Sequence, residues 1–122
     1  MTPNIGILQG RLSPDIDKRF QFFPKDWRRE FALAKACGFF GIEWLVDPKD
    51  PNGWMNNPIF NDYAEIDRVS RETGVPVLSI CADWFMDVCL WEGNPEEHRV
   101  VIRKIIGPAS KTMHKLILIP LL

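Results

Sequence analysis

The stretch VPVLSICAD, residues 75–83, says most about the fold of this 122-residue chain. Its first seven residues form an almost unbroken apolar run, which is typical of a parallel β-strand that is covered on both faces. Similar runs occur at residues 5–8 (IGIL), 42–45 (IEWL) and 116–119 (LILI). Their starts recur about every 35 residues, which is the length of one strand–helix unit. The sequence therefore predicts four parallel strands in an α/β fold.

Helical patterns fill the intervals between these runs. The first two end at glycines suited to a left-handed helix cap, Gly38 and Gly74. The second opens with Asp-x-x-Glu at residues 62–65, a capping-box pattern. The positions expected to be buried, at helical spacing, are Trp27, Phe31 and Ala34 in the first helix and Ile66 and Val69 in the second.

The third helical pattern opens with NPEE at residues 94–97, a cap, a first-turn proline and two acids that suit the helix dipole. We expect the helix to break or kink at Gly107-Pro108, because proline removes a backbone donor and clashes with the preceding turn. Residues 109–113 would then form a short restarted helix. The expected apolar face comprises Val101, Ile102, Ile105 and Ile106.

The connections between these elements are of unequal length. Only a few residues lead from each helix to the next strand, whereas residues 12–25, 47–61 and 85–94 form long connections from strand to helix. Parallel α/β proteins place their ligand chemistry in the loops at the carboxyl ends of the strands. The sequence therefore predicts a functional face at that end.

Two candidate site residues directly follow the first strand. Arg11 can form a bidentate pair with a phosphate or a carboxylate, and Gln9 offers a donor and an acceptor to a sugar hydroxyl. The alternative for Arg11 is an ion pair with Asp15 or Asp17 that holds the loop.

Two acids complete the candidate set. Glu43 lies inside an apolar strand, where a carboxylate is costly unless it is paired or faces a site. It could accept a substrate hydroxyl, take part in proton transfer or pair with Arg11. Asp83 lies where the third strand meets its loop, and it could hold a hydroxyl or cap the loop backbone. Trp44 and Trp84 are the candidate pocket walls, with core packing as the alternative for Trp44.

Composition narrows the classes of function. The net charge of −1 gives no basis for binding nucleic acid or an anionic membrane, and no apolar run reaches the roughly 20 residues that span a bilayer. Three cysteines without CxxC spacing indicate free thiols, and the N-terminus lacks a basic signal region, so we expect a cytoplasmic protein. His98 and His114 are expected at the surface, and we expect no metal site built by this chain alone.

Four segments in order carry a resemblance to a known family: IGILQGRLSP at residues 5–14, GFFGIEW at 38–44, SICADWFM at 79–86 and LIPLL at 118–122. Together they resemble the xylose-isomerase-like TIM-barrel superfamily, and within it the sugar-phosphate isomerases/epimerases. The resemblance covers essentially all of residues 1–122 as one partial domain. It implies the N-terminal half of a (β/α)₈ barrel, with four strands in the order 1-2-3-4 and three intervening helices.

The resemblance also implies a chemistry. Characterised members hold a divalent metal through Glu, Asp, His and Glu on later strands, and two glutamates move a proton next to a carbonyl. This chain would contribute only substrate-side residues, which are Gln9, Arg11, Glu43 and Asp83, toward a sugar or sugar phosphate. Alone it would be inactive. Residues 113–114, Met-His, depart from the glycine that relatives usually carry there, and relatives that cut DNA use early-strand histidines that this chain lacks.

Two other classes are consistent with the pattern. A complete barrel needs about 250 residues, so we expect either a fragment or a half-barrel that dimerises through the uncovered edge of the fourth strand as a binding or structural module. A flavodoxin-like open sheet is weaker, because no glycine-rich phosphate loop opens a helix. Strand order separates the two folds: 1-2-3-4 fits a barrel half, and a reversal around the first strand fits flavodoxin.

Overall fold

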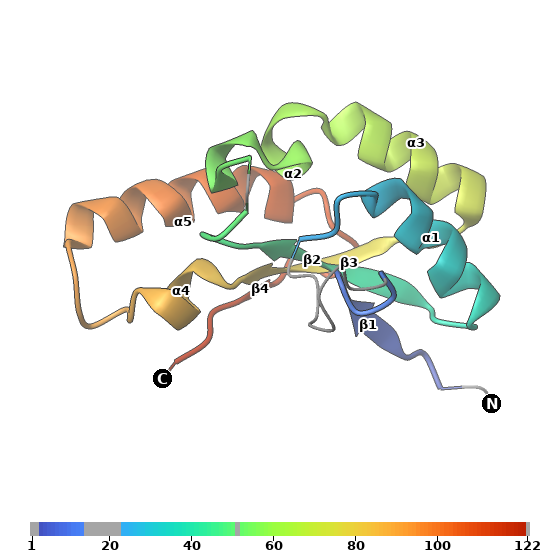
Figure 1. Cartoon of the computed structure of the whole chain (residues 1–122), viewed down its shortest axis with the longest axis horizontal. Coiled ribbons are helices and arrows are strands. Elements are labelled where there is room, and N and C mark those ends of the chain that lie inside the picture. The colour runs from blue at the N-terminus through green and yellow to red at the C-terminus, as the bar shows by residue number, and fades with distance from the viewer. Residues whose placement is uncertain (1–2, 14–22, 51, 122) are drawn as a thin grey trace.

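The computed structural model describes residues 3–13, 23–50 and 52–121, and within them a single sheet of four parallel strands. The strands lie side by side in the order in which they occur along the chain (Figure 1). This confirms the predicted α/β class and strand order, and it differs from the order of a flavodoxin-like sheet. The strands are β1 (Gly6–Leu8), β2 (Gly41–Val46), β3 (Val77–Ala82) and β4 (Ile117–Leu118).

Helices gather on one face of this sheet. Figure 1 shows α1, α2, α3 and α5 above the strands, and no helix among the described residues covers the opposite face. None of these helices combines the length and the apolar character that a membrane crossing requires. The helical elements are α1 (Trp27–Ala36), the 3₁₀ turn η1 (Trp54–Asn56), α2 (Pro58–Asn61), α3 (Tyr63–Thr73), α4 (Trp84–Asp87) and α5 (Pro95–Ala109).

Strand β2 divides its side chains between the two faces. Ile42, Trp44 and Val46 belong to the core under the helices, so the alternation of a strand places Glu43 and Leu45 on the other face. We call this other face the helix-free face. The main core cluster therefore lies under the helices, and Glu43 points away from it on the face that also buries Leu45.

The pairing of β2 with β3 shifts register between Ile42 and Glu43. Ile42 pairs with Val77 but Glu43 pairs with Ser79, so Leu78 is an extra residue of β3. The shift places Ser79 beside Glu43 on the helix-free face.

Leu78 fits only because its neighbours are glycines. A Cβ on Gly41 would lie 2.6 Å from Leu78 Cγ and 2.7 Å from the carbonyl oxygen of Pro76, and a Cβ on Gly6 would lie 2.5 Å from Leu78 Cδ1. Close packing across three strands thus requires the absence of side chains at two of these positions.

Two of the predicted helix ends are confirmed, and one predicted cap is wrong. Gly38 and Gly74 follow α1 and α3 with φ of 78° and 72°. Asp62 precedes α3 but its side chain makes no capping hydrogen bond. The expected partner, Glu65, bonds instead to Arg68 and Arg28, each at 2.9 Å or less. These two guanidinium groups, Arg68 first, lower the pKa of Glu65 to about 2.

The predicted break at Gly107-Pro108 is also wrong. Helix α5 continues to Ala109, and Ser110 N donates to Ile106 O at 3.1 Å. Proline is tolerated because it lies one residue from the helix end, where it removes only one intrahelical bond. Residues 110–114 form turns rather than a restarted helix, and Ile106 is exposed instead of buried.

Candidate functional site

Gln9 joins the end of β1 to β2 through its side chain. Its backbone N–H donates to Glu43 O at 3.0 Å, and its Oε1 then accepts from Leu45 N at 3.0 Å, a position that a backbone carbonyl would occupy in a continuing strand. The side chain is 1% exposed, and its Nε2 has no hydrogen-bond partner in the described part of the chain. The Oε1 atom of Gln9, a predicted site residue, therefore serves the pairing of β1 with β2, and only the buried Nε2 donor remains for a ligand.

The loop after Gln9 is held by a buried carboxylate from α1. Glu30 accepts from Gly10 N through both oxygens, at 3.0 and 2.8 Å, from Leu12 N at 3.3 Å and from Ser13 Oγ at 2.9 Å. Glu30 is 1% exposed. Arg11, which lies in this loop, is thereby carried on a backbone that is fixed on both sides.

Arg11, Glu43 and Asp83 all lie within electrostatic range of one buried thiol. Burial is the main cause that raises the pKa of Cys81 to about 12; the charges of Glu43 and Asp83 add to the rise, and Arg11 opposes it. Arg11 and Asp83 follow the ends of β1 and β3, whereas Glu43 lies inside β2, level with Leu8 at the end of β1. The alternative partners of Arg11, Asp15 and Asp17, lie outside the described residues.

Glu43 has a partner that the sequence did not suggest. Ser79 Oγ donates to Glu43 Oε2 at 2.6 Å across the β2–β3 pair. This single hydrogen bond holds one carboxylate oxygen of Glu43 on the helix-free face.

A second acid, Asp47, joins Asp83 at this edge of the sheet. Asp47 directly follows β2, is 2% exposed, and accepts from Lys49 N at 2.9 Å. Burial raises the pKa of Asp47, and burial followed by the nearby charges of Asp47 and Asp87 raises that of Asp83. Lys49 Nζ lies 3.1 Å from Asp87 Oδ2. The edge therefore presents carboxyl groups that repel one another, with two cations, Arg11 and Lys49, in their field. We use the name strand-end rim for the four residues Arg11, Glu43, Asp47 and Asp83.

Trp44 lies in the helix-side core rather than at the rim. It is 0% exposed, its ring centroid is 5.4 Å from that of Trp27, and its Nε1 donates to Asn57 Oδ1 at 2.8 Å. Asn57 also donates from Nδ2 to Leu45 O at 3.0 Å, so this buried amide supports the end of β2. The predicted pocket-wall residue Trp44 thus packs as core.

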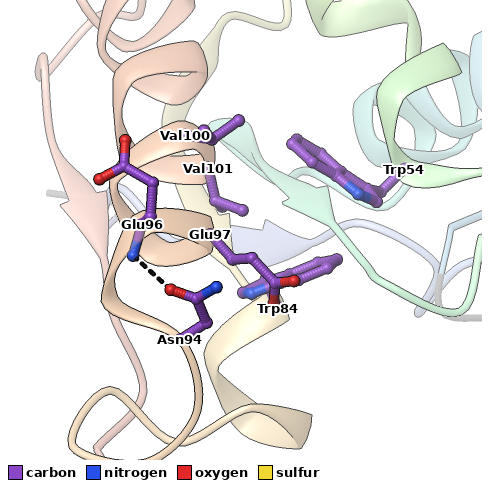
Figure 2. A pocket seen from close by; sticks show the side chains of 7 residues that line it. All are labelled: Trp54, Trp84, Asn94, Glu96, Glu97, Val100 and Val101. Atoms are coloured by element: carbon purple, nitrogen blue, oxygen red, sulfur yellow. Dashed lines mark hydrogen bonds between the residues drawn. The ribbon is translucent and has the colours of Figure 1, made fainter.

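Trp84, the other predicted wall residue, does line a pocket. The pocket has a volume of about 350 Å³ and lies between η1, α4 and the first turns of α5 (Figure 2). We call it the tryptophan pocket. Its lining residues are Trp54, Trp84, Asn94, Glu96, Glu97, Val100 and Val101.

The histidines lie apart from the rim. His98 was expected at the surface but is 5% exposed, with Nε2 2.6 Å from Glu92 O and its ring 5.4 Å from that of Phe85; it ties the loop before α5 to the core. His114 is exposed. Within the described ranges no three His, Cys, Asp or Glu side chains are grouped as a metal would need.

Sequence reasoning missed four polar residues of this region, and two of them had a usable signal. Asp47 follows a strand as Asp83 does, and Glu30 lies three residues after Trp27 on the face expected to be buried. Ser79 and Asn57 had none, because their roles depend on partners that are distant in sequence.

Comparisons with known proteins add no assignment. No family model matches the chain, and no curated protein matches its sequence.

Proposed function

We propose that this chain is the N-terminal half of a (β/α)₈ barrel of the xylose-isomerase-like superfamily, and that it supplies the substrate side of a sugar or sugar-phosphate isomerase/epimerase. The observation that carries the proposal is that Arg11 and Asp83 follow β1 and β3, while Glu43 in β2 pairs with Leu8, the last residue of β1, and all three lie within electrostatic range of Cys81. The carboxyl ends of the strands are where barrel enzymes bind their substrates.

The chemistry of the rim suits a polyhydroxylated anion. A guanidinium binds phosphate oxygens in a bidentate manner, and carboxylates accept from sugar hydroxyls. Glu43 is fixed by the hydroxyl of Ser79, and Arg11 is carried by the loop that Glu30 holds. The buried Nε2 of Gln9 is a donor still to be satisfied at the same edge. Such prearranged polar groups lower the entropic cost of binding.

The described residues do not fit a catalytic metal. They contain no group of three ligands, and the acids of the rim repel one another without a histidine among them. In this proposal the divalent metal and the acid–base pair belong to later strands that the sequence does not contain. The 122-residue chain then binds substrate weakly and moves no proton by itself.

The binding test is a titration of the chain with a ketose phosphate and with the same ketose without phosphate, followed by NMR chemical shifts. We expect the phosphorylated sugar to bind more tightly and Arg11→Ala to remove that preference, with Arg99→Ala, on the exposed surface of α5, as the matched control. Equal binding of both sugars by the unaltered chain would refute a phosphate role for Arg11. Loss of binding in Arg99→Ala as well would refute a specific role for Arg11.

The activity test is solvent deuterium exchange at the carbon next to the carbonyl, with and without added Mn²⁺. We expect no metal-stimulated exchange by the chain alone. Exchange that depends on metal would show that these residues suffice for the proton transfer and would contradict the division of labour proposed here.

A second candidate function is a half-barrel that dimerises as a binding or structural module. The observation that favours it is the outer edge of β4, which has no pairing strand among the described residues and carries exposed Leu116, Leu118 and Leu121. Sedimentation at micromolar concentration tests it: a folded monomer would exclude this candidate, and a dimer lost on Leu118→Lys substitution would support it.

A further inference from the structure

We propose that the tryptophan pocket binds an organic cation, a quaternary or alkylated ammonium group on a small apolar body. This inference is independent of the sugar chemistry proposed for the strand-end rim, because it rests on a different set of side chains. The tryptophan pocket has a volume of about 350 Å³, which lies within the range of small-molecule sites.

Two tryptophans form the main wall of the pocket. The ring centroids of Trp54 and Trp84 are 5.2 Å apart with their planes at 56°, so the rings touch and present a bent aromatic surface. Figure 2 shows Val100 and Val101 projecting from α5 toward this surface. Aromatic faces carry negative electrostatic potential, and tryptophan attracts cations most strongly.

Charge at the pocket favours a cation over an anion. The positive end of α5 would attract an anion, but Asn94 Oδ1 already accepts from Glu96 N at 3.0 Å, and two carboxylates occupy the first turn. Figure 2 shows Glu97 extending toward Trp84, while Glu96 turns away and pairs with Arg99 at 3.0 Å. Glu97 has no ion pair within the described part of the chain. A bound anion would meet this carboxylate, whereas a cation would be paired by it.

The adjoining aromatic group already attracts a cation of the chain itself. Lys104 Nζ lies 5.7 Å from the ring centroid of Phe60, and Phe60 packs edge-on against Trp54 at 5.9 Å. Lys104 engages the ring behind Trp54 and is not among the residues that line the pocket. The surfaces of Trp54 and Trp84 therefore remain available to a cation from solution.

The experiment compares choline with 3,3-dimethylbutan-1-ol, its uncharged carbon analogue of the same shape. Each is titrated into the ¹⁵N-labelled chain, and the indole N–H signals of the tryptophans are followed. We expect choline to shift the signals of Trp54 and Trp84 saturably and to bind roughly 2- to 30-fold more tightly than the alcohol. Trp91, which is 61% exposed and does not line the pocket, serves as the internal control.

Two variants make the test specific. Glu97→Gln keeps the size of an exposed side chain, so the chain should stay folded, and we expect choline affinity to fall roughly 1.5- to 5-fold. Glu92→Gln removes an equal charge from an exposed residue outside the pocket and should leave affinity unchanged. Equal affinities for choline and the alcohol, an unaltered affinity in Glu97→Gln, or a stronger response of the same indoles to inorganic phosphate would each overturn the proposal.

Discussion

Substitution of Glu30 tests whether the loop that carries Arg11 is fixed by a single buried carboxylate. Three donors bond to Glu30: the N–H groups of Gly10 and Leu12 and the hydroxyl of Ser13. Only the pair with Gly10 is fully buried. Replacement of Glu30 therefore leaves one backbone N–H without water or a partner and exposes the other two groups to partial solvation.

The size of the effect follows from these contacts. A hydrogen bond to a charged group contributes about 1.5–3 kcal/mol, and an ordinary one about 1 kcal/mol. With Gly10 valued as the charged bond and the two half-buried donors as ordinary bonds, Glu30→Ala should lower the free energy of unfolding by about 3–5 kcal/mol. Glu30→Gln keeps one acceptor oxygen and loses the charge, so we expect a loss of about 1–3 kcal/mol.

Urea unfolding monitored by circular dichroism measures both losses, and hydrogen exchange locates them. The amides of Gly10 and Leu12 should exchange faster in Glu30→Gln than in the unaltered chain, while those of β3 should change only as far as global stability does. Glu96→Gln, which removes an exposed ion pair, should stay within about 1 kcal/mol. A Glu30→Gln variant as stable as this control, with unchanged exchange at Gly10, would refute the role assigned to Glu30.

Three further predictions follow from the packing and the charges. Gly41→Ala should lower the free energy of unfolding by about 1–3 kcal/mol, since its Cβ would meet the carbonyl oxygen of Pro76; the urea midpoint measures the loss. Asp47→Asn should raise the urea midpoint at pH 7 and have little effect near pH 3. Burial raises the pKa of Asp47 in the folded chain, so its ionisation lowers the free energy of unfolding as the pH rises from the ordinary value of 3.8 through the raised one, and asparagine does not ionise. Exposed Cys37 should react with a thiol reagent at pH 8 before unfolding, and Cys81, with its pKa of about 12, only after it; reaction of Cys81 in the folded chain would contradict its burial.

The sheet was predictable because burial of a strand is a local property of its sequence. Apolar runs marked all four strands, and the regular spacing of these runs indicated their parallel order. The errors arose where a distant partner outweighs the local preference. Glu65 bonds to Arg28 on another helix instead of completing a cap, and His98 is buried against Phe85 rather than exposed. Pro108 is tolerated because the helix was about to end.

The candidate site was predictable only as far as strand ends could be recognised. Arg11 and Asp83 were named because they follow strands, and Glu43 because a carboxylate inside an apolar strand needs a partner or a site; their charges all act on Cys81. The hydrogen bonds that hold these side chains could not be predicted. The hydroxyl on Glu43 comes from a register shift that no single-strand pattern reveals.

Three buried polar side chains among the described residues support the carboxyl ends of β1 and β2. Gln9 replaces a backbone acceptor after β1, Asn57 satisfies Leu45 O near the end of β2, and Glu30 binds the loop that follows β1. Burying an amide or a carboxylate is costly unless its hydrogen bonds are made, and an apolar core does not need them. The same strands are joined at their other ends by short turns with backbone hydrogen bonds, such as Phe40 N to Ile5 O at 2.8 Å. At those other ends Thr112 Oγ1 and Ser70 Oγ also bond to the backbone, but each acts within its own turn. Gln9 and Glu30 instead join elements that are distant in sequence, so we expect the loop that carries Arg11 to loosen when either side chain is removed.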